Sequence, residues 1–317
     1  MLYSIGLNSL VETGITQILF INNLDIESIG MKDENFPGLF LVANKVAIDY
    51  QDNFKLALKM NLVTLVAAAI LSFIPLSHWT IPLLQLIALL TTLACSIYLA
   101  TQKPEKLWYS GRALAESIKT LTWRYISKAE PFNKDDKISK NEFIETLNKA
   151  IQQNREVCQR YSNHLGDEQI TPKMTEMRSQ ELQTRQQNYH LHRIKDQNEW
   201  YTKKAKYNQD RSKCFFRLLI ATNVIAVIFA ATKIAFPNVT PWPTDIFIAT
   251  AASLLTWMQA KKFSELAASY TLAAHEINII KSLSLEEMTE EEFSIFVGDA
   301  ENAFSREHTQ WVARKDI

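Results

Sequence analysis

Four apolar runs, grouped into two pairs, constrain the fold of this chain more than any other feature of its sequence. The first pair covers residues 56–76 and 81–100, and the second covers residues 215–236 and 244–260. A helix of about 20 residues rises about 30 Å, which matches the hydrocarbon core of a bilayer. The runs therefore predict two transmembrane helical hairpins with tight turns. Buried helices of a soluble core also contain such runs, and the flanking charges argue against that alternative.

The fourth run is the weakest candidate for a transmembrane helix. Its apolar part, Ile246–Ala260, has about fifteen residues, whereas a spanning helix needs about 20. As a span it requires Trp242 and Trp257 as anchors at the membrane interfaces.

Basic residues indicate how the hairpins are oriented. They flank both hairpins, while the first turn has none and the second has only Lys233 beside it. Because lysine and arginine concentrate on the cytoplasmic side, both turns are expected to face away from the cytoplasm. Both termini are then cytoplasmic, in a multi-pass protein of the cell (inner) membrane. The flanking basic residues are Lys45, Lys55, Lys59, Lys103, Lys106, Arg112, Arg211, Lys213, Arg217, Lys261 and Lys262.

Composition points to an all-α membrane protein. The chain has only 7 glycines and 9 prolines, and few segments alternate in the manner of a β-strand. Its 34 basic and 34 acidic residues balance, so no basic field predicts nucleic acid as a partner. Cys95, Cys158 and Cys214 are scattered, which is typical of inert thiols in a reducing compartment. The first residues lack the pattern of a secretory signal.

The stretch 108–132 predicts the helix that joins the first hairpin to the cytoplasmic part. Its buried stripe, at helical spacing, consists of Leu107, Leu114, Ile118, Leu121 and Tyr125. The opposite side carries Trp108, Arg112, Glu116, Lys119 and Trp123. Two indoles around alternating charges favour a docking face, which would couple the cytoplasmic part to the hairpin, over a solvated face. We expect this helix to be continuous with the second span, and the helix after the fourth span to continue likewise.

The chain divides into four segments. Residues 1–35 are weakly patterned and form a variable N-terminal segment. Residues 36–132 form a first repeat, 133–190 a soluble helical insert and linker, and 191–317 a second repeat that ends in an amphipathic helix.

Two capping boxes, Ser139–Glu142 and Thr289–Glu292, each predict the start of a cytoplasmic helix. The helix after the second box presents one apolar stripe, made of Phe293, Phe296, Val297, Ala300, Phe304 and Trp311. Apolar stripes on several long helices predict that the cytoplasmic helices pack as a bundle.

The two repeats predict an internal duplication. Tyr50, a hairpin and a helix with Glu116 correspond to Tyr207, a hairpin and a helix with Glu276. The tyrosine and the glutamate are 66 residues apart in the first copy and 69 in the second. Since both halves run in the same direction, we expect a pseudo-symmetry axis along the membrane normal.

Polar residues inside the predicted spans have two interpretations. Small and hydroxyl-bearing side chains hold helices together in lipid, and the same residues line water-filled pores. Four short spans are too few to enclose a wide channel, so a pore would require a homo-oligomer. The candidates for either role are Asn61, Thr64, Gln85, Thr92, Ser96, Asn223, Ser253 and Thr256.

No pattern of catalytic residues is visible. P-loop, nucleophile-elbow, zinc-protease and Cys/His patterns are missing from the sequence. His190 and His192 are two residues apart and so lie on different sides of a helix. We therefore predict that the protein is not an enzyme, needs no cofactor and has no catalytic, cofactor-binding or metal-binding residues.

Three stretches resemble a known family of membrane proteins. They are FPGLFLVANKVAIDYQ at 36–51, WYSGRALAESIKTLTWRYISKAEPF at 108–132 and RIKDQNEWY at 193–201. Together they are similar to tandem SLATT proteins, whose name stands for SMODS- and SLOG-associating two-transmembrane effector domain. Tyr270 and Glu276 fit the same pattern in the second copy. The resemblance extends from about residue 36 to the end.

The resemblance implies a bacterial membrane effector of conflict and defence systems that forms pores in response to nucleotide signals. It also implies a nucleotide-second-messenger synthase or sensor as a partner, besides membrane lipids and further copies of the chain. A competing hypothesis is a structural scaffold, whose cytoplasmic helical stalk recruits partners without conductance. A transporter with an inverted repeat is disfavoured because the two halves are parallel.

Overall fold

The computed structural model describes residues 31–75, 78–162, 164–239 and 241–313. The described residues are 83% helical, and no strand occurs among them. The predicted all-α class is therefore confirmed. The predicted variable N-terminal segment lies outside these ranges, except for residues 31–35.

Two long helices carry the chain from the helical bundle into the hairpins. Helices α2 (Gly38–Phe73) and α9 (Asp196–Ala235) have 36 and 40 residues, and each passes from a polar half into an apolar half. The chain returns through α3 (Thr80–Gln102) and α10 (Thr244–Lys261). The bundle is completed by the turn η1 (Asp33–Asn35), α4 (Pro104–Ile126), α5 (Asp136–Gln153), α6 (Arg155–Cys158), α7 (Pro172–Ser179), α8 (Leu182–Tyr189), the π-helix η2 (His190–Lys195), α11 (Phe263–Leu283) and α12 (Glu290–Ala313).

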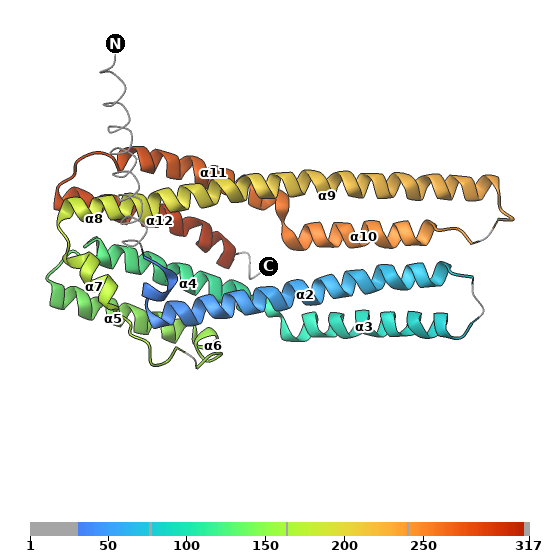
Figure 1. Ribbon diagram of the computed structural model, residues 1–317, viewed down its shortest axis with the longest axis horizontal. Coiled ribbons are helices and arrows are strands. Elements are labelled where there is room, and N and C mark those ends of the chain that lie inside the picture. The colour runs from blue at the N-terminus through green and yellow to red at the C-terminus, as the bar shows by residue number, and fades with distance from the viewer. Residues whose placement is uncertain (1–30, 76–77, 163, 240, 314–317) are drawn as a thin grey trace, which may run out of the picture.

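The molecule is elongated, with both hairpins at one end and the bundle at the other (Figure 1). In each half the long helix packs against the next two long helices: α2 against α3 and α4, and α9 against α10 and α11. Contacts between α10 and α2 and between α12 and α4 join the halves. Helices α2 and α9 run in the same direction, in agreement with a parallel duplication.

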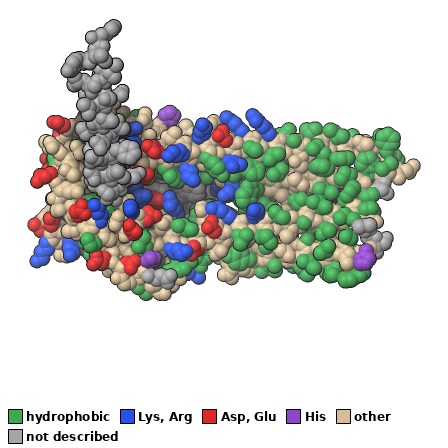
Figure 2. Space-filling view, viewed as in Figure 1, with side chains coloured by type: hydrophobic (Ala, Val, Ile, Leu, Met, Phe, Trp, Pro, Cys, Tyr) green, Lys and Arg blue, Asp and Glu red, His purple; other side chains and the backbone are tan. Residues whose placement is uncertain are grey.

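The hairpins have the surface of membrane-spanning helices. Among the described residues, three helical segments are long and apolar enough to cross a membrane: α2, α3 and the continuous stretch Leu182–Ala235 that ends with α9. Helix α10 has 18 residues, with Asp245 in its first turn and Lys261 in its last, and is not among the three. Figure 2 shows hydrophobic side chains over the hairpins and basic side chains where the hairpins meet the bundle. This distribution is typical of helices that end at a membrane interface.

Both hairpins end at a sharp break. Lys103 separates α3 from α4, and Lys262 separates α10 from α11, with φ angles of 42° and 49°. This left-handed conformation interrupts a right-handed helix. At the first break Pro104 contributes, because proline disfavours the right-handed helical conformation at the residue before it. The expectation that both spans continue straight into the cytoplasmic helices is therefore wrong.

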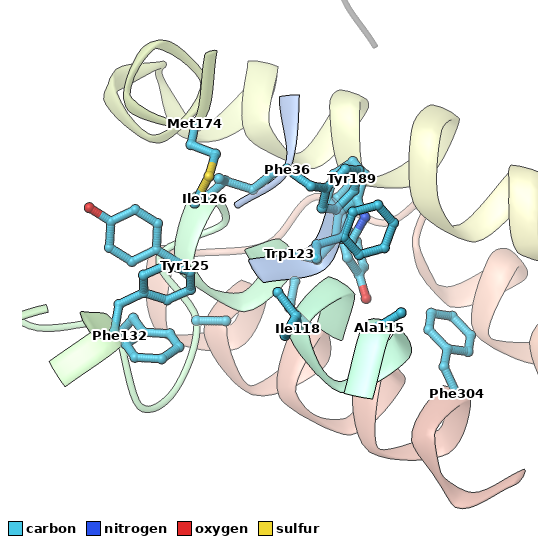
Figure 3. Close-up of a cluster of buried hydrophobic side chains, with 14 of the residues drawn as sticks. Phe36, Ala115, Ile118, Trp123, Tyr125, Ile126, Phe132, Met174, Tyr189 and Phe304 are labelled. Carbon is cyan, nitrogen blue, oxygen red and sulfur yellow. The ribbon is translucent and has the colours of Figure 1, made fainter. Parts of the chain in front are cut away.

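An aromatic core holds the bundle together, and both halves contribute to it. Tyr189 lies edge-on to Trp123 and to Phe293, with ring centroids 5.8 and 6.1 Å apart. Figure 3 shows Trp123 and Tyr189 within this cluster around α4. The predicted stripe of α12 contributes four buried side chains, those of Phe293, Val297, Ala300 and Phe304. The side chain of Trp311 is not among those that the structure describes.

One of the two predicted capping boxes exists. Thr289 N donates to Glu292 Oε2 at 2.9 Å, and Glu292 N donates to Thr289 Oγ1 at 3.3 Å. The box at Ser139 is wrong, because α5 begins earlier and Asp135 caps it. Ser139 is buried inside α5, and its hydroxyl donates to the carbonyl of Phe132 at 3.0 Å.

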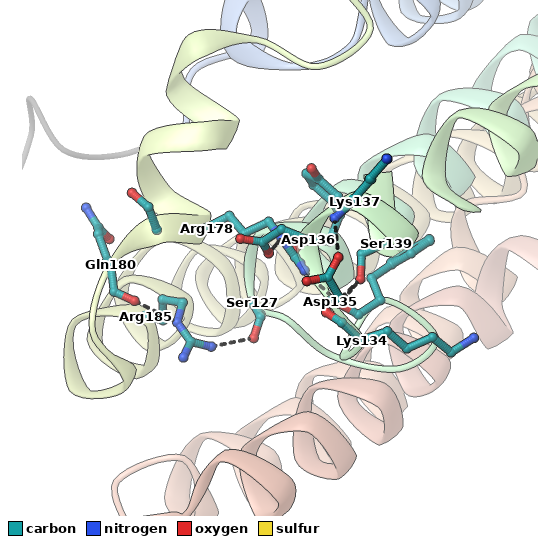
Figure 4. Close-up of polar contacts among 12 residues, drawn as sticks. Ser127, Lys134, Asp135, Asp136, Lys137, Ser139, Arg178, Gln180 and Arg185 are labelled. Carbon is teal, nitrogen blue, oxygen red and sulfur yellow. Dashed lines mark hydrogen bonds and ion pairs between the residues drawn. The ribbon is translucent and has the colours of Figure 1, made fainter. Parts of the chain in front are cut away.

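Two buried arginines attach the predicted insert to the end of α4. Arg178 on α7 donates to the carbonyl oxygens of Tyr125 and Phe132, and Arg185 on α8 donates to that of Ser127. Figure 4 shows both arginines beside the loop that follows α4. Guanidinium groups at a helix C-terminus satisfy carbonyls that lack intrahelical partners and favour the negative end of the dipole. The insert thereby packs on α4.

Candidate coupling face and polar residues of the spans

The predicted coupling face of α4 is largely covered by other parts of the chain. Trp123 is 2% exposed and Glu116 is 7% exposed. Trp108 and Lys119 are half-buried, and only Arg112 is exposed. Since the opposite stripe of α4 is buried as well, α4 lies in the interior of the bundle, where it packs against both α2 and α12.

The charges of this face are coupled to the second half of the chain. Arg112 and Glu116 form the predicted ion pair, with Arg112 Nη2 2.6 Å from Glu116 Oε1. Burial lowers the pKa of Lys119, and the nearby guanidinium of Arg193 lowers it further, whereas Glu116 acts in the opposite direction. Lys119 therefore responds to charges from both halves.

A buried ion pair of the second half lies behind this face, and its carboxylate also binds a hydroxyl of the first half. Arg193, on the π-helix, donates from Nε and Nη2 to Oε1 and Oε2 of Glu301 on α12, both at 2.7 Å. The hydroxyls of Thr120 on α4 and Tyr189 on α8 donate to the same carboxylate at 2.9 and 3.0 Å. Arg193 is 1% exposed and Glu301 is 0% exposed. Elements from the start, middle and end of the bundle thus meet at one carboxylate.

Electrostatics keep these donors protonated. Burial disfavours the charged form of Arg193, but the charge and hydrogen bonds of Glu301 outweigh burial and raise the pKa of the guanidinium. Burial raises the pKa of Tyr189, and the charge of Glu301 adds to this effect. At neutral pH the Glu301 carboxylate therefore always faces a charged arginine and a protonated tyrosine.

Neither Arg193 nor Glu301 is among the site residues predicted from the sequence. Glu301 lies on the apolar stripe of α12, four residues after Val297 and three before Phe304. A carboxylate on a buried helix face is costly unless it is paired. The position of Glu301 on this stripe therefore indicates that the carboxylate has a buried partner. The sequence does not identify which residue that partner is.

In the first hairpin, polar side chains hold the two helices together. Asn61 on α2 donates to the carbonyl of Thr92 at 2.9 Å and to Ser96 Oγ at 2.7 Å, both on α3. Thr64 Oγ1 lies 2.7 Å from Thr92 Oγ1. Gln85 is half-buried, about two turns before Thr92. These contacts favour helix packing over pore lining for the bonded residues.

In the second hairpin, two polar candidates face outward. Asn223 on α9 and Thr256 on α10 are exposed. Each donates to a carbonyl of its own helix, Asn223 to Leu219 at 3.0 Å and Thr256 to Ala252 at 2.9 Å. Ser253 is buried, and its Oγ has no hydrogen-bond partner within the described ranges. The hairpins thus differ, since the first uses its polar groups internally and the second presents two of them to its surroundings.

The described residues contain no group of three or more histidine, cysteine, aspartate or glutamate side chains that could hold a metal ion. The contacts found at the candidate site are ion pairs and hydrogen bonds between helices. Such contacts couple the position of one helix to that of another.

Two family models match the chain one after the other. SMODS and SLOG-associating 2TM effector domain 3 matches residues 37–186, and SMODS and SLOG-associating 2TM effector domain 1 matches residues 189–311. The chain belongs to the SLATT family. The predicted tandem of SLATT domains is therefore confirmed. A search of curated proteins and a search of solved structures find no match to the chain.

SLATT domains are two-transmembrane domains associated with effector roles in conflict or defence systems. Each matched range in this chain contains one hairpin and the bundle helix that follows it. The Glu301 carboxylate is thus a contact between two SLATT domains, because Thr120 belongs to the first and Arg193 to the second.

Proposed function

We propose that this tandem SLATT protein is a non-enzymatic effector of the bacterial inner membrane that assembles into a homo-oligomer and opens a pore. A nucleotide signal, made or sensed by a partner protein, triggers opening. In this proposal α10 crosses the membrane as the fourth span, and the bundle and both termini are cytoplasmic. The basic side chains at the junction of hairpins and bundle support this orientation.

The observation that carries the proposal is the outward position of Asn223. It lies about 12 Å into the span that begins at residue 215. Its amide nitrogen donates only within α9, and lipid offers no water to its remaining polar groups. A second copy of the chain supplies such groups, because amide side chains hydrogen-bond across helices in lipid. An oligomer formed around this face places Asn223 and Thr256 beside a conducting path.

In this proposal, the two helix breaks transmit movements of the bundle to the hairpins. Lys103 and Lys262 connect the returning spans to α4 and α11. A movement of the bundle then changes the angle at each break instead of rotating one continuous helix. The Arg112–Glu116 pair lies about two and a half turns beyond Lys103, so it senses that angle first.

Substitution of two asparagines separates assembly from hairpin packing. Asn223→Leu should reduce the oligomeric state and the release of a trapped dye from liposomes while leaving the melting temperature unchanged, because Asn223 bonds only within its own helix. Asn61→Leu is the matched control, and it should lower the melting temperature because it removes two hydrogen bonds between α2 and α3. Light scattering measures the oligomeric state. Dye release from the liposomes is measured with and without added cyclic dinucleotides.

Two results would contradict the proposal. The first is an Asn223→Leu variant that assembles and releases dye like the wild type. The second is a wild type that retains dye under every condition and does not depolarise the cells that express it. That second result would leave the scaffold, which recruits partners through its cytoplasmic helices without conductance.

A further inference from the structure

A basic cavity of about 500 Å³ lies between the two SLATT domains, where the hairpins meet the bundle. Helices α2, α4 and α9 and the junction of α10 with α11 form its walls. No aspartate or glutamate is among its lining residues. The basic side chains that line it are Lys55, Arg112, Lys204, Lys261 and Lys262.

Ion pairs offset only part of this charge. Arg112 and Lys55 each have a carboxylate within 4 Å on a neighbouring turn of their own helix. Lys204, Lys261 and Lys262 form no salt bridge within the described part of the chain. The positive charges of Lys55 and Lys204 also repel that of Lys261. The folded chain thus holds like charges close together, and an anion in the cavity would relieve their repulsion.

The position of the cavity indicates the source of that anion. Lys55 directly precedes the first predicted span, 56–76, and Lys261 directly follows the last, 244–260. Trp108, Trp200 and Tyr207 line the same cavity, and tryptophan and tyrosine prefer the depth of the lipid headgroups. Figure 2 shows that the hydrophobic surface of the hairpins begins next to the basic side chains of the junction, on the side away from the bundle.

We propose that the cavity binds the phosphate of an anionic phospholipid from the cytoplasmic leaflet and thereby holds the two SLATT domains together at the membrane surface. The volume suffices for a headgroup, since ligand cavities typically hold about 300–1,000 Å³. Basic pockets between helices on the cytoplasmic side are the expected sites for such headgroups. The acyl chains then lie on the apolar hairpins, where a soluble phosphate has nothing to contact. This binding does not require that the protein conduct ions.

The test uses the full chain in detergent micelles, with native mass spectrometry to count bound lipid. The wild type should bind phosphatidylglycerol in preference to phosphatidylcholine. The double variant Lys204→Gln/Lys261→Gln should weaken phosphatidylglycerol binding by about tenfold or more, since each basic group near an anionic headgroup contributes appreciably to affinity. The matched control is Lys203→Gln/Lys206→Gln, which removes the same charge from exposed positions outside the cavity lining and should change affinity less than about twofold.

A second variant and a second measurement distinguish a loss of lipid binding from misfolding. Lys204→Arg/Lys261→Arg keeps the charge and should bind phosphatidylglycerol like the wild type. Without anionic lipid, the glutamine variant should melt at or above the wild-type temperature because it relieves repulsion. Equal weakening in both glutamine pairs, or no preference over phosphatidylcholine, would overturn the proposal. So would equally tight binding of soluble glycerol phosphate, which would assign the cavity to a free phosphate ligand.

Discussion

At the scale of single residues, Glu301 shows how a buried charge becomes part of a fold. Removing a carboxylate and a guanidinium from water costs several kcal/mol per ion, and good geometry with further hydrogen bonds offsets that cost. Glu301 accepts a bidentate contact from Arg193 and two further hydrogen bonds from the hydroxyls of Thr120 and Tyr189. Because the donors come from three different helices, the carboxylate also determines how those helices meet.

Glu301→Gln should therefore destabilise the bundle by about 3–5 kcal/mol, since it leaves the Arg193 guanidinium buried without a counter-charge. Thermal or denaturant unfolding in micelles measures the effect. Adding Arg193→Met to Glu301→Gln should restore part of the loss, because it removes the unpaired charge.

Glu145→Gln is the control for this prediction. Glu145 forms an exposed pair with Lys149 at 2.8 Å, and its loss should leave the unfolding curve unchanged. A Glu301→Gln variant as stable as this control would show that the buried pair contributes little to the stability of the bundle.

At the scale of helices, the approach of α4 to α2 depends on a missing side chain. A Cβ atom on Gly111 would lie 2.9 Å from the nitrogen of Ala47 and 3.0 Å from the carbonyl oxygen of Ala43. Both are backbone atoms of α2, which no side-chain rotation moves away. Gly111 therefore sets the distance between the two helices, and it belongs to the WYSGRALAESIK stretch that resembles the SLATT pattern.

Gly111→Ala should push α2 and α4 apart and destabilise the bundle by about 1–3 kcal/mol, the usual cost of overpacking. Gly298→Ala on α12 is the matched control, because a Cβ there meets nothing within 4 Å. Alanine at that helical position should stabilise by about 0.5–1 kcal/mol. Thermal unfolding of both variants compares them directly, and equal melting temperatures would refute the close approach.

At the scale of the whole molecule, function depends on the side of the membrane on which the bundle lies. Hydrophobic side chains cover the hairpins, and the basic side chains gather at the junction with the bundle (Figure 2). A bundle on the cytoplasmic side meets both the anionic leaflet and any nucleotide made in the cell. The opposite orientation would separate it from these partners.

Cysteine labelling from outside intact cells tests this orientation. In a background without Cys95, Cys158 and Cys214, cysteine at His78 or Asn238 should react with a reagent that does not cross membranes. Cysteine at Lys140, an exposed position of α5, should react only after the cells are opened. Reaction at Lys140 with protection at both hairpin ends would reverse the topology.

The sequence by itself determined the features that depend on neighbouring residues. Apolar length predicted the first three spans, the basic flanks predicted a charged junction, and Thr289–Glu292 predicted the start of α12. Each of these is a property of about 20 consecutive residues or fewer, which a helix expresses wherever it lies. The resemblance to SLATT proteins rested on equally local stretches.

Only the tertiary structure decided how the helices meet. It buried Trp123 and Glu116 within the bundle, paired Arg193 with Glu301 more than 100 residues away, and turned Asn61 inward but Asn223 outward. Periodicity shows that a helix has two faces, but not which helix covers each face. A buried polar side chain is satisfied by whichever donor the packing brings to it, so its partner is a property of the assembled bundle.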